Sequence, residues 1–131
     1  MKKEERNILI DTSAWVEFFR GTSKTADTVA KLIEKGEACI CGVISCELIQ
    51  GSKSDDEALH LSGVLSALNY IEMTPDLWLR AGKISAGLRK KGITLPMSDL
   101  LIGAIALEHG LEVLTLDEHF ASIPGLKLMS G

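Results

Sequence analysis

The sequence predicts an α/β fold in which a central parallel sheet carries helices on both faces. Short apolar segments of strand length alternate with longer amphipathic segments from end to end, as in parallel sheets whose strands are joined by helices. The first apolar segment, 8–10, ends abruptly in the carboxylate of Asp11. No repeat, low-complexity tract or linker interrupts the 131 residues. We therefore expect one domain spanning 1–131.

Capping residues and periodicity predict the elements of the first half. Ser13 is placed to cap a first helix that stops at Gly21, and Gly36 to close a second one. Apolar residues recur at helical spacing between these signals. In order, we expect a strand at 8–10, helices at 14–19 and 26–33, a buried strand at 38–41, and helices at 43–50 and 61–68.

Proline and glycine divide the second half in the same way. Thr74-Pro75 is a strong helix start, with a hydroxyl cap and proline at the first helical position. After Pro96, Ser98 is placed to cap a helix that is apolar nearly all round and should be buried. In order, we expect a strand at 70–73, helices at 75–91 and 99–109, a strand at 112–116, a turn or short helix at 117–121, and an edge strand at 126–128.

Bulk properties restrict the class of protein. The apolar segment near the amino end is too short for a signal peptide or membrane span, so we expect a cytoplasmic protein. The net charge of −4 argues against non-specific nucleic-acid binding by a broadly basic surface. Cys39, Cys41 and Cys46 lie in one apolar region without a fourth zinc ligand at the usual spacing. We expect them to be buried, reduced thiols.

Four acids lie in or beside apolar segments, where a carboxylate is costly unless it is paired or bound to a metal. They are Asp11, Glu47, Asp99 and Asp117. In open α/β sheets, ligands bind outside the carboxyl ends of the strands. The first and penultimate strands are usually central in this architecture, so Asp11 and Asp117 are expected to be neighbours.

The chemistry of such acids favours a hard divalent cation. Converging carboxylates raise one another's pKa unless a cation joins them, and oxygen ligands suit Mg²⁺ or Mn²⁺. Such a centre typically activates water and clamps a phosphodiester. The hydroxyl residues Thr12, Ser13 and Thr115 are candidates to orient the ligands or waters.

Each acid also has a structural explanation. Asp11 could cap the first helix, Asp99 could favour a helix amino end, and Asp117 could be a turn residue. Glu47 could face solvent. His119, beside Phe120, is expected to be a turn or packing residue rather than a ligand.

Four motifs in order resemble the PIN-domain ribonucleases, and within them the VapC-type toxins of prokaryotic toxin–antitoxin modules. They are Leu9-Ile10-Asp11-Thr12-Ser13, Glu47-Leu48-x-x-Gly51, Ser98-Asp99-Leu100-Leu101-Ile102-Gly103 and Thr115-x-Asp117-x-His119-Phe120. The likeness covers nearly the whole chain. Two positions depart from it: Leu116 stands where many relatives carry a polar or basic residue, and Gly103 where alanine is common.

The resemblance implies a metal-dependent endoribonuclease in which Asp11, Glu47, Asp99 and Asp117 are the catalytic acids and the ligands of Mg²⁺ or Mn²⁺. It also implies a homodimer held inactive by an antitoxin whose carboxyl-terminal segment covers the site. Trp15, Phe18 and Phe19 follow Asp11 closely. Because not all three can enter the core of so small a domain, we expect some of them to form an apolar groove for that segment.

Two other functions fit part of the pattern. A receiver-type signalling domain also has a small α/β fold with an acidic Mg²⁺ site, but it needs a pair of acids after the first strand and a lysine after the last. Here Asp11 is single, and Lys127 lies inside the final apolar stretch. The second alternative is a non-catalytic PIN-like module that binds RNA or a partner, and the presence of all four acids argues against it.

Overall fold

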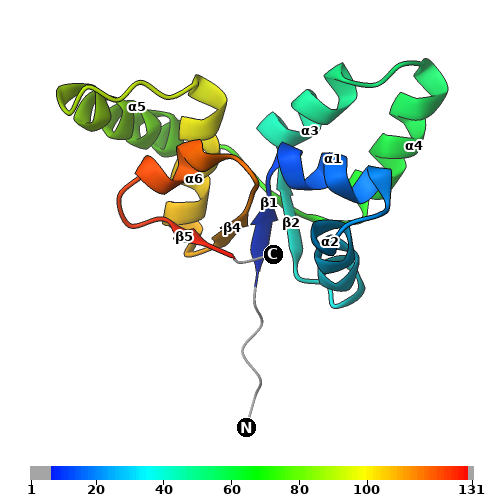
Figure 1. Cartoon of the computed structure of the whole chain (residues 1–131). Coiled ribbons are helices and arrows are strands. Elements are labelled where there is room, and N and C mark those ends of the chain that lie inside the picture. Colours follow the sequence, from blue (N-terminus) through cyan, green and yellow to red (C-terminus); the bar gives the residue numbers. More distant parts are fainter. Residues whose placement is uncertain (1–6, 130–131) are drawn as a thin grey trace, which may run out of the picture.

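A five-stranded, all-parallel sheet forms the centre of the fold in the computed structural model, which describes residues 7–129 (Figure 1). This confirms the predicted fold class. The strand order is β3-β2-β1-β4-β5, with β1 in the middle and β4 beside it. The strands are β1 (Ile8–Ile10), β2 (Ala38–Cys41), β3 (Asn69–Ile71), β4 (Glu112–Leu114) and β5 (Lys127–Leu128).

The helices occupy two groups, because the chain first adds strands on one side of β1 and then crosses back to add strands on the other side. The first group joins β1 to β2 and β2 to β3, and the second joins β3 to β4 on the other side of β1. Right-handed crossovers then place the groups on opposite faces of the sheet, as Figure 1 shows. The groups are α1 (Thr12–Arg20), α2 (Lys24–Glu34), α3 (Gly42–Gln50) and α4 (Asp55–Ser66), and then α5 (Pro75–Lys90) and α6 (Met97–His109).

The core is built around β1 and α6. All three residues of β1 are fully buried, which is typical of a central parallel strand covered on both faces. In α6 every residue from Asp99 to Ala106 is buried, so the helix predicted to be apolar all round does lie in the core. Within residues 7–129, no helix combines the length and the apolar character needed to cross a membrane.

A close contact behind α6 accounts for one departure from the family pattern. A Cβ atom added at Gly103 would lie 2.6 Å from the Cδ1 atom of Ile123. Ile123 is itself buried, directly after the 3₁₀ helix η1 (Glu118–Ser122). The missing side chain at Gly103 therefore leaves room for the tip of the Ile123 side chain against the core helix.

The sequence predicted the positions of the helices better than the residues that cap them. Thr74 caps α5 as expected, accepting a hydrogen bond from the Leu77 amide at 3.3 Å. Two other predicted caps are wrong. Ser13 lies inside α1 and makes no cap, and α6 begins at Met97 after Pro96 without a side-chain cap from Ser98. In both cases the helix begins one residue before the serine.

The prediction of three buried thiols is wrong for one cysteine. Cys39 and Cys41 are free and buried in β2, but Cys46 is exposed on α3. The apolar region that holds all three changes from strand to helix at Gly42. The change to a helical period turns Cys46 away from the core.

Candidate active site

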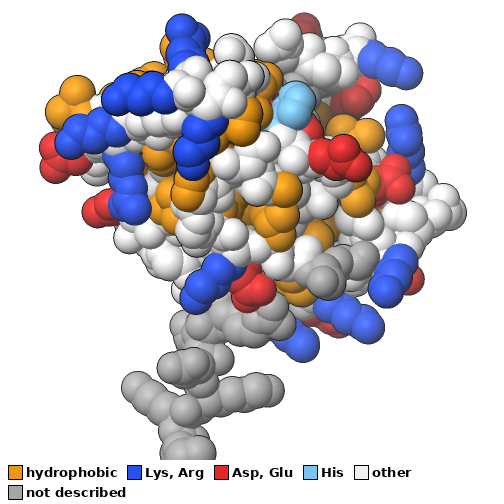
Figure 2. Space-filling model, turned by 60° about the vertical axis from the view of Figure 1, so that its left-hand side comes forward, with side chains coloured by type: hydrophobic (Ala, Val, Ile, Leu, Met, Phe, Trp, Pro, Cys, Tyr) orange, Lys and Arg blue, Asp and Glu red, His pale blue; other side chains and the backbone are white. Residues whose placement is uncertain are grey.

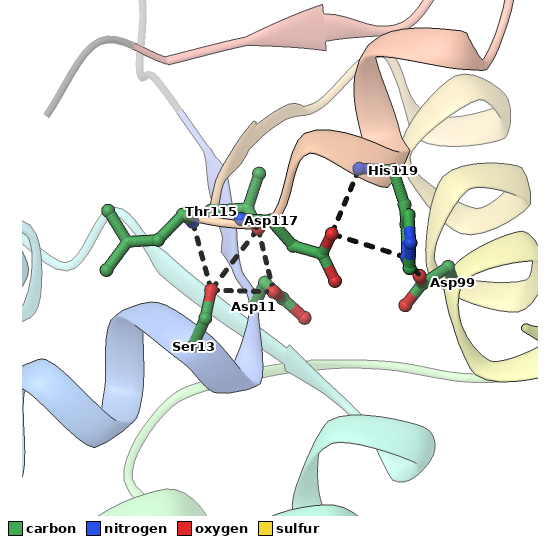
Figure 3. Close-up of polar contacts among 7 residues, drawn as sticks. Asp11, Ser13, Asp99, Thr115, Asp117 and His119 are labelled. Atoms are coloured by element: carbon green, nitrogen blue, oxygen red, sulfur yellow. Dashed lines mark hydrogen bonds and ion pairs between the residues drawn. The ribbon is translucent and has the colours of Figure 1, made fainter.

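The candidate site lies at the carboxyl ends of β1 and β4, where the crossover connections diverge to opposite sides. A parallel sheet leaves a crevice at this point, and ligands bind there in open α/β folds. Asp11 directly follows β1, and Thr115 and Asp117 come after β4. Asp99 reaches the same place from the first turn of α6 (Figure 3). Asp11 and Asp117 are therefore neighbours, as the strand order predicted.

Two hydroxyl groups fix the carboxylate of Asp11. Thr115 donates to Asp11 Oδ2 at 2.8 Å, and Ser13 donates to the same oxygen at 2.9 Å. Each hydroxyl also accepts a backbone N–H, Thr115 from Asp117 at 2.9 Å and Ser13 from Leu116 at 3.0 Å (Figure 3). The network ties the segment after β4 to the end of β1, so the buried Asp11 side chain has a defined orientation.

A second cluster joins Asp99, Asp117 and His119. The Nδ1 atom of His119 lies 2.9 Å from Asp99 Oδ2 and 3.3 Å from Asp117 Oδ1. Asp117 accepts the backbone N–H of His119 at 2.9 Å, which starts the short helix η1. One donor atom from each of the three side chains lies within 4.8 Å of the others. Asp99 is buried, whereas the His119 ring is half-exposed.

Burial and charge act on the titration of this cluster. Burial raises the pKa of Asp99 above its ordinary value, the hydrogen bond from His119 lowers it in part, and the charges of Asp117 and Asp11 raise it further. The hydrogen bond with Asp99 raises the pKa of His119, and the charge of Asp117 raises it further. Asp99 is thus a buried acid under like-charge repulsion, a setting that favours an added cation.

Glu47 enters the site from α3 and contacts α1. Its Oε1 atom accepts the hydroxyl of Thr12 at 2.7 Å. Glu47 does not belong to the group formed by Asp99, Asp117 and His119, which is the one group of three or more close metal-ligand side chains in the described part of the chain. Its charge nevertheless reaches the same region: burial raises the pKa of the Cys41 thiol, and the charges of Asp11 and Glu47 raise it further.

The three hydroxyl residues chosen from the sequence all contact acids directly. Thr12 donates to Glu47, while Ser13 and Thr115 donate to Asp11. His119 lies in the turn, as expected, and its ring in addition contacts two of the four acids, a contact that the sequence did not lead us to expect. One signal in the sequence could have indicated this. An aspartate side chain commonly accepts the backbone N–H two residues later. Asp117 and His119 have this spacing and make this hydrogen bond, which turns the His119 ring toward the acids.

The donor set fits a divalent metal ion. The carboxylates of Asp99 and Asp117 both contact the His119 ring, and Asp11 adds a third negative charge nearby. Within residues 7–129, no ion pair joins Asp99 or Asp117 to a lysine or arginine. Oxygen donors of this kind are the ligands that Mg²⁺ and Mn²⁺ take in proteins. A bound cation would offset the repulsion that raises the pKa of Asp99.

A family model and the curated relatives of this chain indicate the same protein family. The PIN domain model matches residues 8–126. Ribonuclease VapC11 of Mycobacterium tuberculosis is 32% identical over 118 residues, covering 86% of this chain and 88% of the relative.

Solved structures share the fold at lower identity. The DNA-bound VapBC of Salmonella typhimurium superposes with a TM-score of 0.82 at 23% identity, covering 95% of this chain and 97% of that chain. A toxin–antitoxin complex from Klebsiella pneumoniae gives 0.75 at 24% identity, covering 92% and 95%. The family match also rules out a receiver-type domain. The chain belongs to the PIN domain family and, within it, to the VapC-type proteins.

Proposed function

We propose that this protein is a metal-dependent endoribonuclease that cleaves RNA phosphodiester bonds and acts as the toxin of a toxin–antitoxin pair. The observation that carries the proposal is the convergence of Asp11, Asp99 and Asp117 at the switch point of the sheet, with Glu47 beside them. The family supports it, because relatives that cover most of the chain are named ribonucleases.

Each acid has a proposed task that its contacts support. Asp99 and Asp117 present facing oxygens and would hold the ion. Asp11, held by two hydroxyl groups, would add a third negative charge to the site from the end of β1. Glu47, oriented by Thr12, would position water or an outer ligand from α3. When bound, Mg²⁺ or Mn²⁺ would supply Lewis-acid activation of water and charge stabilisation on the phosphate.

The site has no protein nucleophile in this proposal. Ser13 and Thr115 are engaged with Asp11, and Thr12 is engaged with Glu47. Their hydroxyl protons are directed at carboxylates, so they position acids rather than attack phosphorus. A water molecule held in the site would then be the nucleophile, and the acids would keep the water and the phosphodiester close together and correctly oriented.

A depression beside the acids suits an antitoxin segment. Thr12 and Glu47 line it together with the apolar residues Val16, Phe19 and Leu61. Of the three aromatic residues expected to form such a groove, Trp15 is fully buried, Phe18 packs partly against the core, and Phe19 is 40% exposed. Phe19 and Val16 therefore supply the exposed apolar surface of the depression. An inhibitory peptide lying there would reach Glu47 directly.

A homodimer in the cytoplasm completes the proposal. Trp78 and Met97 are exposed and line a depression between α5 and α6, which offers apolar surface to a second copy. Multi-angle light scattering on the purified chain tests this: a mass of one chain would contradict the dimer.

The ribonuclease proposal is tested by incubating the purified chain with mixed cellular RNA in Mg²⁺, in Mn²⁺ and in EDTA. We expect cleavage with either ion and none in EDTA. Asp11→Asn should abolish cleavage while the variant stays folded. Cleavage that survives in EDTA would contradict the metal-dependent mechanism, and an intact RNA pool in both ions would favour a non-catalytic binding module.

A further inference from the structure

His119 is the nitrogen-bearing side chain within the candidate metal site. Its Nδ1 atom faces the oxygens of Asp99 and Asp117 at 2.9 and 3.3 Å (Figure 3). The resemblance to the family supplied only acids as ligands, and neither Asp11 nor Glu47 belongs to this close group within residues 7–129. The ring therefore changes the chemistry of the donor set from oxygen alone to oxygen with nitrogen.

The two distances match those between ligands of one ion. Carboxylate oxygens and imidazole nitrogens lie about 2.0–2.1 Å from small divalent metals. Two ligands at adjacent corners of an octahedron of that size are roughly 3.0 Å apart, and at corners of a tetrahedron roughly 3.4 Å. The Nδ1 atom thus lies at a ligand-to-ligand distance from both acids, and an ion bound there would displace the Nδ1 proton of the hydrogen bond with Asp99 and release it to solvent.

The backbone holds the ring in this place. The His119 N–H donates to Asp117 Oδ1 at 2.9 Å, and the next residue, Phe120, is 1% exposed. The ring itself is 52% exposed, which leaves the cluster open to an ion from solvent. The turn is held on one side by the buried Phe120 and on the other by the carboxylate of Asp117. Such a turn holds the His119 ring in a fixed position, as a metal ligand requires.

We propose that His119 Nδ1 is a metal ligand that gives this centre a preference for Mn²⁺ over Mg²⁺. The inference rests on the metal-dependent function proposed above and specifies the ion for the same site. Mg²⁺ is a hard ion that takes oxygen ligands and keeps its waters, whereas Mn²⁺, which also takes oxygen ligands, is a first-row transition ion and accepts an imidazole nitrogen more readily than Mg²⁺ does. A nitrogen donor between two carboxylates therefore adds affinity for Mn²⁺ and little for Mg²⁺.

Two other roles for His119 make different predictions. As a competitor, the ring would occupy the place of the ion, and its removal would raise the affinity for both metals. As a positioning residue for Asp99, its removal would lower both affinities by the same factor. Only a direct ligand makes the ratio of the two affinities depend on His119.

The first test compares the affinities of Mn²⁺ and Mg²⁺ by titration calorimetry on the tag-free full chain, without RNA. We expect His119→Gln to weaken Mn²⁺ binding by about tenfold or more and Mg²⁺ binding by about threefold or less. The matched control is His109→Gln. His109 ends α6 and lines a depression with Asn7 and Gly36 at the opposite end of the sheet, so both affinities should be unchanged.

The outcomes separate this inference from the proposed function. Equal losses or a gain for both ions in His119→Gln would overturn the ligand role and leave the metal-dependent function intact. If the wild-type chain binds neither ion, the metal-dependent function itself is wrong.

The second test does not depend on the folding of the His119 variant. The chain has three histidines, and the double variant His60→Gln/His109→Gln leaves His119 as the sole imidazole. Pulsed EPR of this variant with bound Mn²⁺ should show coupling to a directly coordinated nitrogen. A Mn²⁺ complex without nitrogen coupling would overturn the proposal.

Discussion

Thr115 donates its hydroxyl to Asp11 across 104 positions of sequence, with an oxygen–oxygen distance of 2.8 Å. Asp11 follows β1 and Thr115 follows β4, so this hydrogen bond joins the two strands at the point where their carboxyl ends meet. The same hydroxyl accepts the backbone N–H of Asp117 at 2.9 Å. Thr115 thereby places two of the acids relative to one another.

Thr115→Val should therefore reduce both stability and cleavage. Valine keeps the shape but removes the donor to a carboxylate and the acceptor for the Asp117 N–H. A lost hydrogen bond to a charged group costs about 1.5–3 kcal/mol, and the partial exposure of Thr115 places our expectation at the low end. Denaturant unfolding measures the loss, and RNA cleavage should fall with it.

Two variants control the Thr115 prediction. Thr115→Ser keeps the hydroxyl and should restore most of both properties. Thr28→Val removes an exposed hydroxyl that donates to the Lys24 carbonyl at 3.0 Å, and it should change stability by about 0.5 kcal/mol or less. Full activity in Thr115→Val would mean that Asp11 needs no such support.

Glu47→Gln should separate function from architecture. Glutamine has similar size and helix propensity, and its amide oxygen can still accept the Thr12 hydroxyl. If Glu47 contributes to the repulsion among the acids, the variant melts at the same temperature as wild type or higher in EDTA. It should gain less from added Mn²⁺ and lose RNA cleavage. Melting well below wild type in EDTA would make Glu47 a structural residue.

The protonation of His119 should depend on Asp99. The hydrogen bond with Asp99 raises the pKa of His119 above 6.5 in the metal-free protein. Because the folded-state pKa is the higher one, this pair stabilises the fold below about pH 6.5, and the stabilisation is lost as pH rises through the folded pKa.

An NMR titration of the ring protons in EDTA measures that pKa. Asp99→Asn should bring the pKa of His119 back toward its ordinary value, although the charge of Asp117 remains. An unchanged titration in Asp99→Asn would show that the ring does not hold the contact with Asp99 in solution.

Phe19→Asp should weaken inhibition by the antitoxin and leave RNA cleavage intact. Phe19 is 40% exposed and lines the depression that reaches Thr12 and Glu47, so a charge there opposes the burial of an apolar segment. Leu59→Asp is the matched control, since Leu59 is exposed on α4 but does not line the depression. Growth on co-expression with the adjacent small gene measures inhibition, and equal rescue of both variants would contradict the groove.

The sequence predicted the fold because its signals are local. Alternating strand and helix segments, the Thr74-Pro75 start and the apolar residues of α6 each depend on neighbouring residues. The pairing of β1 with β4 followed from general rules for the order of parallel strands. Those rules alone place Asp11 near Asp117.

The contacts missed from the sequence depend on tertiary packing. The ring of His119 reaches Asp99 where η1 packs against α6, and Ile123, directly after η1, packs against Gly103. The hydroxyl of Ser13 serves Asp11 rather than the end of its own helix. Cys46 is exposed because α3 begins at Gly42, one turn before Cys46, and the helix directs this side chain away from the core. Apart from the two-residue spacing of Asp117 and His119 and the helical period that turns Cys46 outward, the linear sequence displays no period or spacing that indicates these relationships.

The most direct test of the central claim is RNA cleavage by Asp99→Asn beside wild type, in Mn²⁺ and in EDTA. Asp99 is the buried acid of the cluster, and its raised pKa reflects burial and the charges of Asp117 and Asp11. We expect the variant to fold, with stability in EDTA within about 1 kcal/mol of wild type, and to cleave no RNA with or without Mn²⁺. Cleavage by Asp99→Asn at the wild-type rate would contradict the acidic metal site described here.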